Sequence, residues 1–124
     1  MKDEFRQWLA YADENLQGAR LLFESRLFNL VLQNIQQCVE KMLKSMLIKK
    51  GIKFPKTHGI NELCALLKQH GMFVPLDDDE CDLLDSIYLP SKYPFGSSLP
   101  DFEPNAAICT KCIDMAQRIR NSIG

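Results

Sequence analysis

Two short stretches of the chain carry residue types that bind or transfer phosphate groups. Lys56 and His58 lie in one stretch, and Lys92 and Tyr93 lie in the other. A lysine ammonium binds phosphate oxygens, a histidine donates a hydrogen bond or moves a proton near neutral pH, and a tyrosine ring stacks on a base. The pattern indicates phosphate binding by Lys56 and Lys92, a hydrogen bond from His58 and stacking by Tyr93.

Two further lysines, Lys41 and Lys44, lie on the polar side of a predicted helix, with Gln37 one turn before Lys41. They extend the basic set toward the end of that helix, and we include both as candidate phosphate ligands. A plainer interpretation is that both lysines are solvated. In that case Glu40 pairs with Lys44 at four-residue spacing and contributes only about 0.2–0.5 kcal/mol.

Cysteine and acidic clusters resemble metal sites only in part. Cys109 and Cys112 fall inside a predicted helix, and a closed zinc site needs two further ligands. The acidic run from Asp77 to Glu80 is explained by capping and by the helix dipole, since no calcium-loop glycine spacing follows it. We expect neither a metal nor a cofactor.

The composition is that of one domain, residues 1–124, with 46% hydrophobic residues. A formal net charge of -1 argues against a protein that coats nucleic acid non-specifically. A phosphate partner therefore requires a local basic cluster. The five cysteines are an odd number within apolar patterns, which is typical of reduced thiols in the cytoplasm. No apolar run approaches the roughly 20 residues of a membrane span, so we expect a soluble cytoplasmic protein.

The elements that must position these residues are helices, because apolar residues recur every three or four positions and no alternating strand appears. The pattern predicts helices over residues 3–24, 28–49, 57–70, 77–88 and from 104 onward. Gly51 should end the second helix, Thr57 should cap the third, and Pro104 should occupy the first position of the fifth. Proline, glycine and serine clusters should exclude a helix from residue 89 to 103.

Short connections favour antiparallel neighbours, so we expect an all-α fold, an up-and-down four-helix bundle with an additional C-terminal helix. In such a bundle the second helix ends, the third begins, the fourth ends and the fifth begins at the same end. Helix N-termini favour anions there. The topology therefore predicts that Lys56, His58, Lys92 and Tyr93 gather into a phosphate site.

The second helix carries apolar residues over about half of its circumference, more than the roughly 100° stripe of a surface helix. It must contact more than one neighbour. We also expect some apolar surface of the second or the first helix to be paired between subunits.

The chain resembles the HEPN domain, the higher eukaryotes and prokaryotes nucleotide-binding module. The residues that carry the resemblance are Gln37, Glu40-Lys41, Leu43-Lys44, Phe54-Pro55-Lys56-Thr57-His58 and Tyr93-Pro94, within a span from Trp8 to about Ile119. The resemblance implies a helical bundle that is usually a homodimer. It also implies a minimal nucleotidyltransferase as a partner.

One branch of that family consists of metal-independent ribonucleases marked by an arginine followed, after four to six residues, by a histidine. No arginine stands at that distance before His58 or His70. Lys53 does precede His58 at that spacing, but lysine lacks the planar fork that grips phosphate. Lys92 stands where relatives commonly carry arginine before Tyr-Pro.

The resulting prediction is a non-catalytic nucleotide- or RNA-binding homodimer with a nucleotidyltransferase partner, in a toxin-antitoxin-like or substrate-presenting role. One alternative is a metal-independent ribonuclease toxin in which His58 is the general acid or base and Lys56 or Lys92 stabilises the phosphorane. Another is a ligand-free helical scaffold that uses the wide apolar face of the second helix.

Overall fold

The computed structural model describes residues 2–54, 56, 59–92 and 104–123, with nothing but helices and their connections in these ranges. The helices are α1 (Lys2–Glu24), α2 (Phe28–Lys49), α3 (Ile60–Gln69), α4 (Asp78–Lys92) and α5 (Ala106–Ile123). The predicted all-α bundle is confirmed. In the described part, none of these helices is long and apolar enough to cross a membrane.

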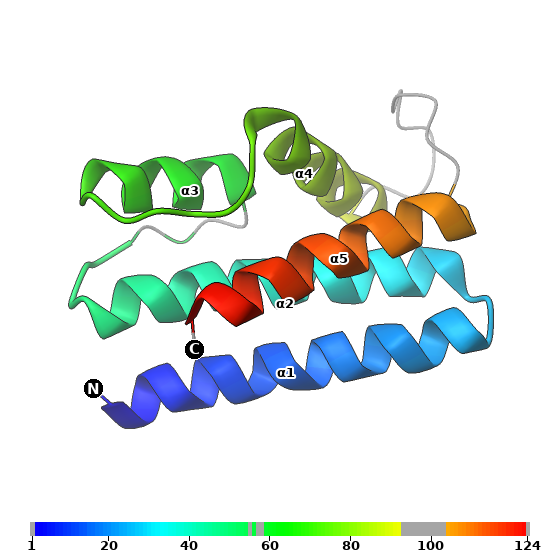
Figure 1. Ribbon diagram of the computed structural model, residues 1–124, viewed down its shortest axis with the longest axis horizontal. Helices are drawn as coiled ribbons and strands as arrows, with labels where there is room; N and C mark the ends of the chain where they lie inside the picture. The colour runs from blue at the N-terminus through cyan, green and yellow to red at the C-terminus, as the bar shows by residue number, and fades with distance from the viewer. Residues whose placement is uncertain (1, 55, 57–58, 93–103, 124) are drawn as a thin grey trace.

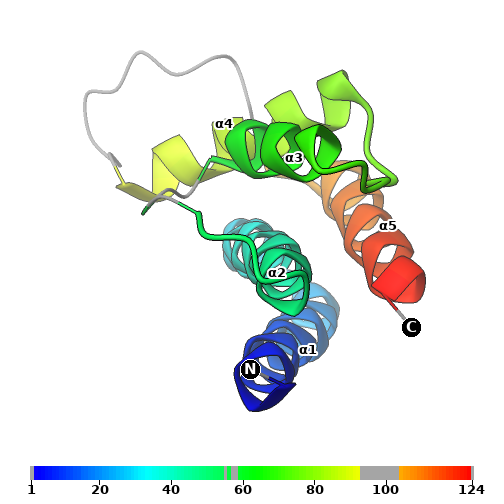
Figure 2. The same cartoon turned by 90° about the vertical axis from the view of Figure 1, so that its left-hand side faces the viewer.

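The second helix is the centre of the molecule. α1 and α2 form an antiparallel hairpin, joined by a tight turn in which Arg26 has a φ of 59°. α5 packs on one side of α2, and the α3–α4 pair covers another (Figure 2). α2 therefore contacts all four other helices, as the width of its apolar face predicted.

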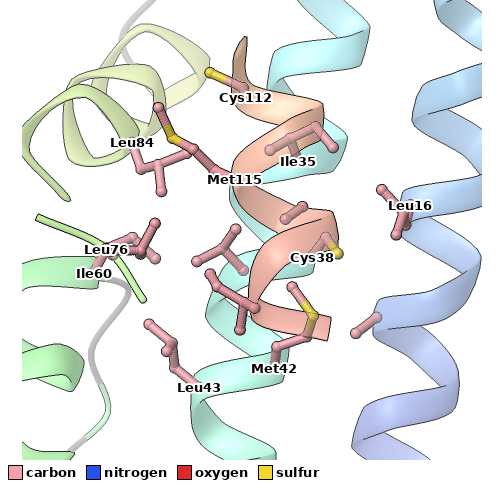
Figure 3. Packing of buried hydrophobic residues seen from close by; sticks show 14 of the residues in the cluster. Leu16, Ile35, Cys38, Met42, Leu43, Ile60, Leu76, Leu84, Cys112 and Met115 are labelled. Atoms are coloured by element: carbon pink, nitrogen blue, oxygen red, sulfur yellow. The ribbon is translucent and has the colours of Figure 1, made fainter. Parts of the chain in front are cut away.

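The core forms where these helices meet around α2. Met42 and Leu43 of α2 are fully buried. Figure 3 shows them among Leu16 of α1, Leu84 of α4 and Met115 of α5. Each buried leucine or methionine contributes roughly 1.5–3 kcal/mol relative to an exposed one, so this shared core holds the helices in place.

The end of α2 follows the prediction from Gly51, which has a φ of 71°. The Ile52 amide donates to the Leu47 carbonyl at 2.9 Å, and the Gly51 amide donates to the Ile48 carbonyl at 2.9 Å. Glycine adopts this left-handed conformation without the steric cost that a Cβ brings. The helix therefore stops where its sequence permits the turn.

The predicted start of α3 is wrong. The helix begins at Ile60, with Gly59 at the N-cap position and no side-chain cap from its own segment. Thr57, the predicted cap, lies outside the described residues. Asp85 of α4 caps the helix instead: its carboxylate accepts hydrogen bonds from the amides of Ile60 at 2.6 Å and Asn61 at 3.1 Å.

Two further predicted boundaries are corrected. α4 continues through Pro90 to Lys92, although residues from 89 onward were expected to be non-helical. Proline lacks the N–H that would bond the carbonyl four residues earlier. Pro90 lies in the last turn, where only two residues of the helix follow it, so the helix can include it. α5 begins at Ala106 and not at Pro104, because the Asn105 side chain accepts a hydrogen bond from the Ile108 amide at 2.9 Å.

The common end predicted for four helix termini is also wrong. The Cys109 thiol contacts the Phe28 carbonyl at 3.5 Å, which places the start of α5 beside the start of α2. α2 and α5 therefore run in the same direction, and α2 ends at the opposite side of the molecule (Figure 1). Residues after α2 and before α5 do not share one end of the bundle.

Candidate functional site

Polar side chains interrupt the apolar surface of α2 along one strip. We call Gln36, Gln37, Glu40, Lys41 and Lys44 the α2 polar strip. Three of its members, Gln36, Glu40 and Lys44, are buried. Within the strip, the Gln37 side-chain amide donates to Gln36 Oε1 at 3.0 Å. Because burying polar groups costs free energy unless they are bonded, such a strip indicates a structural or binding role.

Lys44 is held in a closed setting. Its Nζ donates to Oε2 of Glu40 at 2.8 Å. The same Nζ lies 5.6 Å from the ring centroid of Trp8 and 5.7 Å from that of Phe54. The interpretation of Lys44 as a solvated lysine is therefore wrong, although its predicted pairing with Glu40 is confirmed. A carboxylate already neutralises this charge.

Lys41 has a different environment at the seam between α1 and α2. Its Nζ donates to Oδ1 of Asn15 at 2.8 Å, and Asn15 in turn donates to Oδ1 of Asn34 at 3.0 Å. Asn34 donates to the Leu30 carbonyl at 3.1 Å, which completes a directional chain of amides. This chain fixes the position of the lysine head group.

Within the described part of the chain, the partners of Lys41 are neutral. Besides Asn15, its Nζ faces the ring of Tyr11 at 5.9 Å from the centroid. Among the described residues, no carboxylate forms an ion pair with Lys41. Because no carboxylate of the described residues pairs with it, this half-buried ammonium can attract an anion.

Tyr11, Asn15 and Asn34 were missed by sequence reasoning. Tyr11 is 55% exposed beside the lysine, so its ring is accessible for stacking on a base. The available signal was the one-turn spacing of Tyr11 and Asn15 on α1, outside its apolar stripe. That signal became meaningful only once α1 and α2 were paired.

Cys38 lies close to this cluster but has no reactive character. Burial raises the pKa of its thiol to about 12, and Asp13 acts in the same direction, while Lys41 and Arg120 oppose it. The group is a neutral thiol at neutral pH. It therefore serves as a core residue and not as a nucleophile.

The other predicted site residues are not gathered beside Lys41 by any described contact. Lys56 is exposed in the connection between α2 and α3. Lys92 is the last residue of α4, and His58 and Tyr93 lie outside the described residues. Their predicted roles stay predictions.

The N-terminus of α3 does not offer the open anion site that the topology suggested. The amides of Ile60 and Asn61 are bonded to Asp85. The Asn61 side-chain amide also donates to Asp82 at 2.8 Å and to Asp85 at 2.9 Å. A protein carboxylate thus occupies the position that a phosphate would take.

The candidate metal ligands are the histidine, cysteine and acidic side chains of the described residues. Across those ranges, no group of three or more histidine, cysteine or acidic side chains is placed to share a metal ion. Cys109 and Cys112 are buried in α5, and burial raises the pKa of both thiols, that of Cys112 to about 12. These two residues pack in the core.

The fold and the comparisons agree on the class of protein. The family model for the HEPN domain matches residues 5–124, so the chain belongs to the HEPN family. A crystal structure of an archaeal HEPN homologue is similar at a TM-score of 0.71 and 27% identity, over 96% of this chain and 93% of that one. A comparison with curated proteins gives no match. The predicted family and its fold are confirmed.

Proposed function

We propose that this HEPN protein binds a nucleotide or RNA without cleaving it, and that it does so as a cytoplasmic homodimer with a minimal nucleotidyltransferase partner. The observation that carries the proposal is the environment of Lys41. Its ammonium is positioned by Asn15, bordered by the exposed ring of Tyr11, and without a carboxylate partner among the described residues.

Lys41 and Tyr11 supply two complementary contacts for a nucleotide. The ammonium meets a phosphate oxygen, and the ring stacks on a base. Lys44 is committed to Glu40, so its part is to hold Trp8 and Phe54 against α2. Further contacts along the bound RNA are proposed for Lys56, His58, Lys92 and Tyr93.

The non-catalytic character rests on the sequence. The spacing of arginine and histidine that marks the ribonuclease branch is absent before His58 and His70. Lysines hold phosphate as point charges and do not reproduce the bidentate grip of arginine. Binding without cleavage fits this set of side chains better.

Exposed apolar residues support the homodimer. Leu27 and Leu30, at the turn between α1 and α2, are 48% and 43% exposed. Neighbouring exposed apolar side chains favour burial against a partner. A second copy that covers this turn would leave Lys41 and Tyr11 to the nucleic acid. The nucleotidyltransferase partner rests on the family resemblance, and the cytoplasmic location is supported by five free cysteines.

The test is binding of labelled single-stranded RNA, and of a nucleoside triphosphate, to the wild type and to Lys41→Gln. Glutamine keeps most of the length and a donor for Asn15 but removes the charge. Lys111→Gln is the control, because Lys111 is an exposed lysine of α5. We expect Lys41→Gln to weaken binding of the RNA. The slope of the logarithm of the binding constant against the logarithm of the salt concentration should become shallower by about 0.7, the value for one phosphate contact on a single strand. Equal binding by both variants would contradict the site.

A metal-free cleavage assay separates this proposal from the ribonuclease alternative. The wild type and His58→Ala are incubated with the same RNA in the presence of a chelator. Intact RNA in both samples agrees with the proposal. Cleavage by the wild type that is lost in the variant would replace it with the ribonuclease toxin.

A further inference from the structure

Two thiols face each other in the interface between α3 and α4. The Sγ atoms of Cys64 and Cys81 are 3.5 Å apart, and the two residues are separated by 17 positions in the sequence. Both are almost completely buried, at 3% and 2% exposure. This separation is close to contact distance and exceeds the S–S bond length of about 2.0 Å by roughly 1.5 Å.

The helices around the thiol pair are held in register on both sides. Toward the start of α3, Asp85 binds the amide of Ile60 at 2.6 Å. Toward its end, Lys68 lies 4.0 Å from Asp78. The two helices run antiparallel, and these contacts keep Cys64 opposite Cys81. The thiol pair is thus flanked on both sides by contacts between α3 and α4.

Cys81 differs from the other cysteines of the chain. The hydrogen bond between the two thiols lowers the Cys81 pKa and raises that of Cys64, and Lys68 adds to the lowering at Cys81. Burial raises the pKa of the three remaining thiols, Cys38, Cys109 and Cys112. Cys81 is therefore the thiol of the pair that ionises more readily.

We propose that Cys64 and Cys81 are a redox site, at which hydrogen peroxide or a similarly small peroxide forms an intramolecular disulfide that locks α3 to α4. A small oxidant is required because both sulfur atoms are buried. It reaches them when the α3–α4 pair opens locally.

The reaction balances in two steps. The Cys81 thiolate attacks one oxygen of hydrogen peroxide, the O–O bond breaks, and hydroxide leaves while Cys81 becomes a sulfenic acid. The Cys64 sulfur then attacks the sulfenic sulfur, the S–O bond breaks, and water leaves with the Cys64 proton. Hydroxide takes up the proton that Cys81 had released. Two thiols and one peroxide thus give one disulfide and two water molecules.

The bond would join two helices that pack on α2 without belonging to the α1–α2 hairpin. A disulfide reduces the freedom of the unfolded chain and opposes separation of the elements that it joins. Oxidation should therefore slow the opening of α3 and raise the melting temperature. The α1–α2 seam with Lys41 should be unaffected, so this proposal stands apart from the proposed function.

The experiment treats the reduced full-length protein with hydrogen peroxide, blocks the remaining thiols under denaturing conditions, and maps peptides by mass spectrometry. We expect a loss of about 2 Da, a Cys64–Cys81 cross-linked peptide and a higher melting temperature that a reductant reverses. Cys64→Ala and Cys81→Ala should lose all three effects. Cys38→Ala, which removes another buried cysteine, should retain them.

Even if a variant fails to fold, the peptide map of the oxidised wild type shows whether the Cys64–Cys81 disulfide forms. A disulfide that involves any other cysteine, or one between two molecules, would overturn the proposal. Overoxidation of Cys81 to sulfinic acid without a cross-link, or five thiols that remain unmodified, would overturn it as well.

Discussion

The ammonium of Lys44 lies 2.8 Å from Oε2 of Glu40, and side-chain exposures of 8% and 5% mean that water reaches neither group freely. At four-residue spacing on an exposed helix, this pair would be worth a few tenths of a kcal/mol. Burial changes its role, because removing one partner leaves the other with a charge in a poorly solvated place. The pair thereby ties the α2 polar strip to α1 through the Trp8 ring.

We expect Lys44→Ala to destabilise the fold by about 3 kcal/mol, since truncating one member of a buried ion pair typically costs about 3–5 kcal/mol. Urea unfolding followed by circular dichroism measures the change. Lys50→Ala is the control, because Lys50 is exposed and should alter stability by less than about 0.5 kcal/mol. In a double-mutant cycle, Lys44→Met with Glu40→Leu should cost less than the sum of the single changes. A sum that is strictly additive would argue against the pair.

Asp85 should be necessary for the start of α3. Its carboxylate accepts hydrogen bonds from two α3 amides, so Asp85→Ala removes an N-terminal cap and should cost about 1–2 kcal/mol. Hydrogen exchange of the first α3 amides should accelerate more than exchange in α1. Asp114→Ala, an exposed acid of α5, provides the control. Unchanged protection at Ile60 and Asn61 would show that the cap does not hold the helix.

The residues of α2 and α3 show which features the sequence could predict. Gly51 ended α2 as expected, because a left-handed turn residue acts through its own backbone. The cap of α3 could not be predicted, since Asp85 comes from another helix and only the fold brings it to Ile60. The closed setting of Lys44 has the same origin, because Trp8 comes from α1 and Phe54 from the connection that follows α2.

The direction of α5 was mispredicted for a related reason. Short connections dictate antiparallel neighbours, but the long segment before α5 permits either direction. The contact between Cys109 and Phe28 places the starts of α5 and α2 side by side, and α5 runs parallel to α2 (Figure 1). The four residues predicted to meet at one end of the bundle were individually plausible. Their grouping depended on a topology that periodicity cannot determine.

Acid should destabilise the protein through Glu80. The Arg118 guanidinium bonds both carboxylate oxygens, at 3.1 and 2.9 Å, and lowers the Glu80 pKa below its ordinary value of 4.5. A carboxyl whose pKa is depressed by folding stabilises the folded state above its unfolded pKa. That stabilisation is lost as the pH falls through the lower folded value.

Urea unfolding between pH 7 and pH 3 tests the linkage. Below about pH 4.5 the wild type should lose stability, and Glu80→Gln should show a smaller loss over the same range. Arg118→Gln should reduce the pH dependence in the same way, because it removes the main cause of the pKa shift. The contribution of Glu80 is refuted if all three proteins show parallel curves.

Tyr11 should contribute to RNA binding without contributing to stability. Its ring is 55% exposed and lies beside the Lys41 ammonium, so it can lose its contacts without opening the core. Base stacking on an aromatic ring is worth about 1–3 kcal/mol, so Tyr11→Ala should weaken binding about 5- to 150-fold. Tyr11→Phe should bind nearly as well as the wild type, because it retains the ring. Leu21→Ala, at another exposed apolar position of α1, should leave binding unchanged. If Tyr11→Ala bound RNA as tightly as Leu21→Ala, the base would have to stack elsewhere, and only Lys41 would remain of the proposed site.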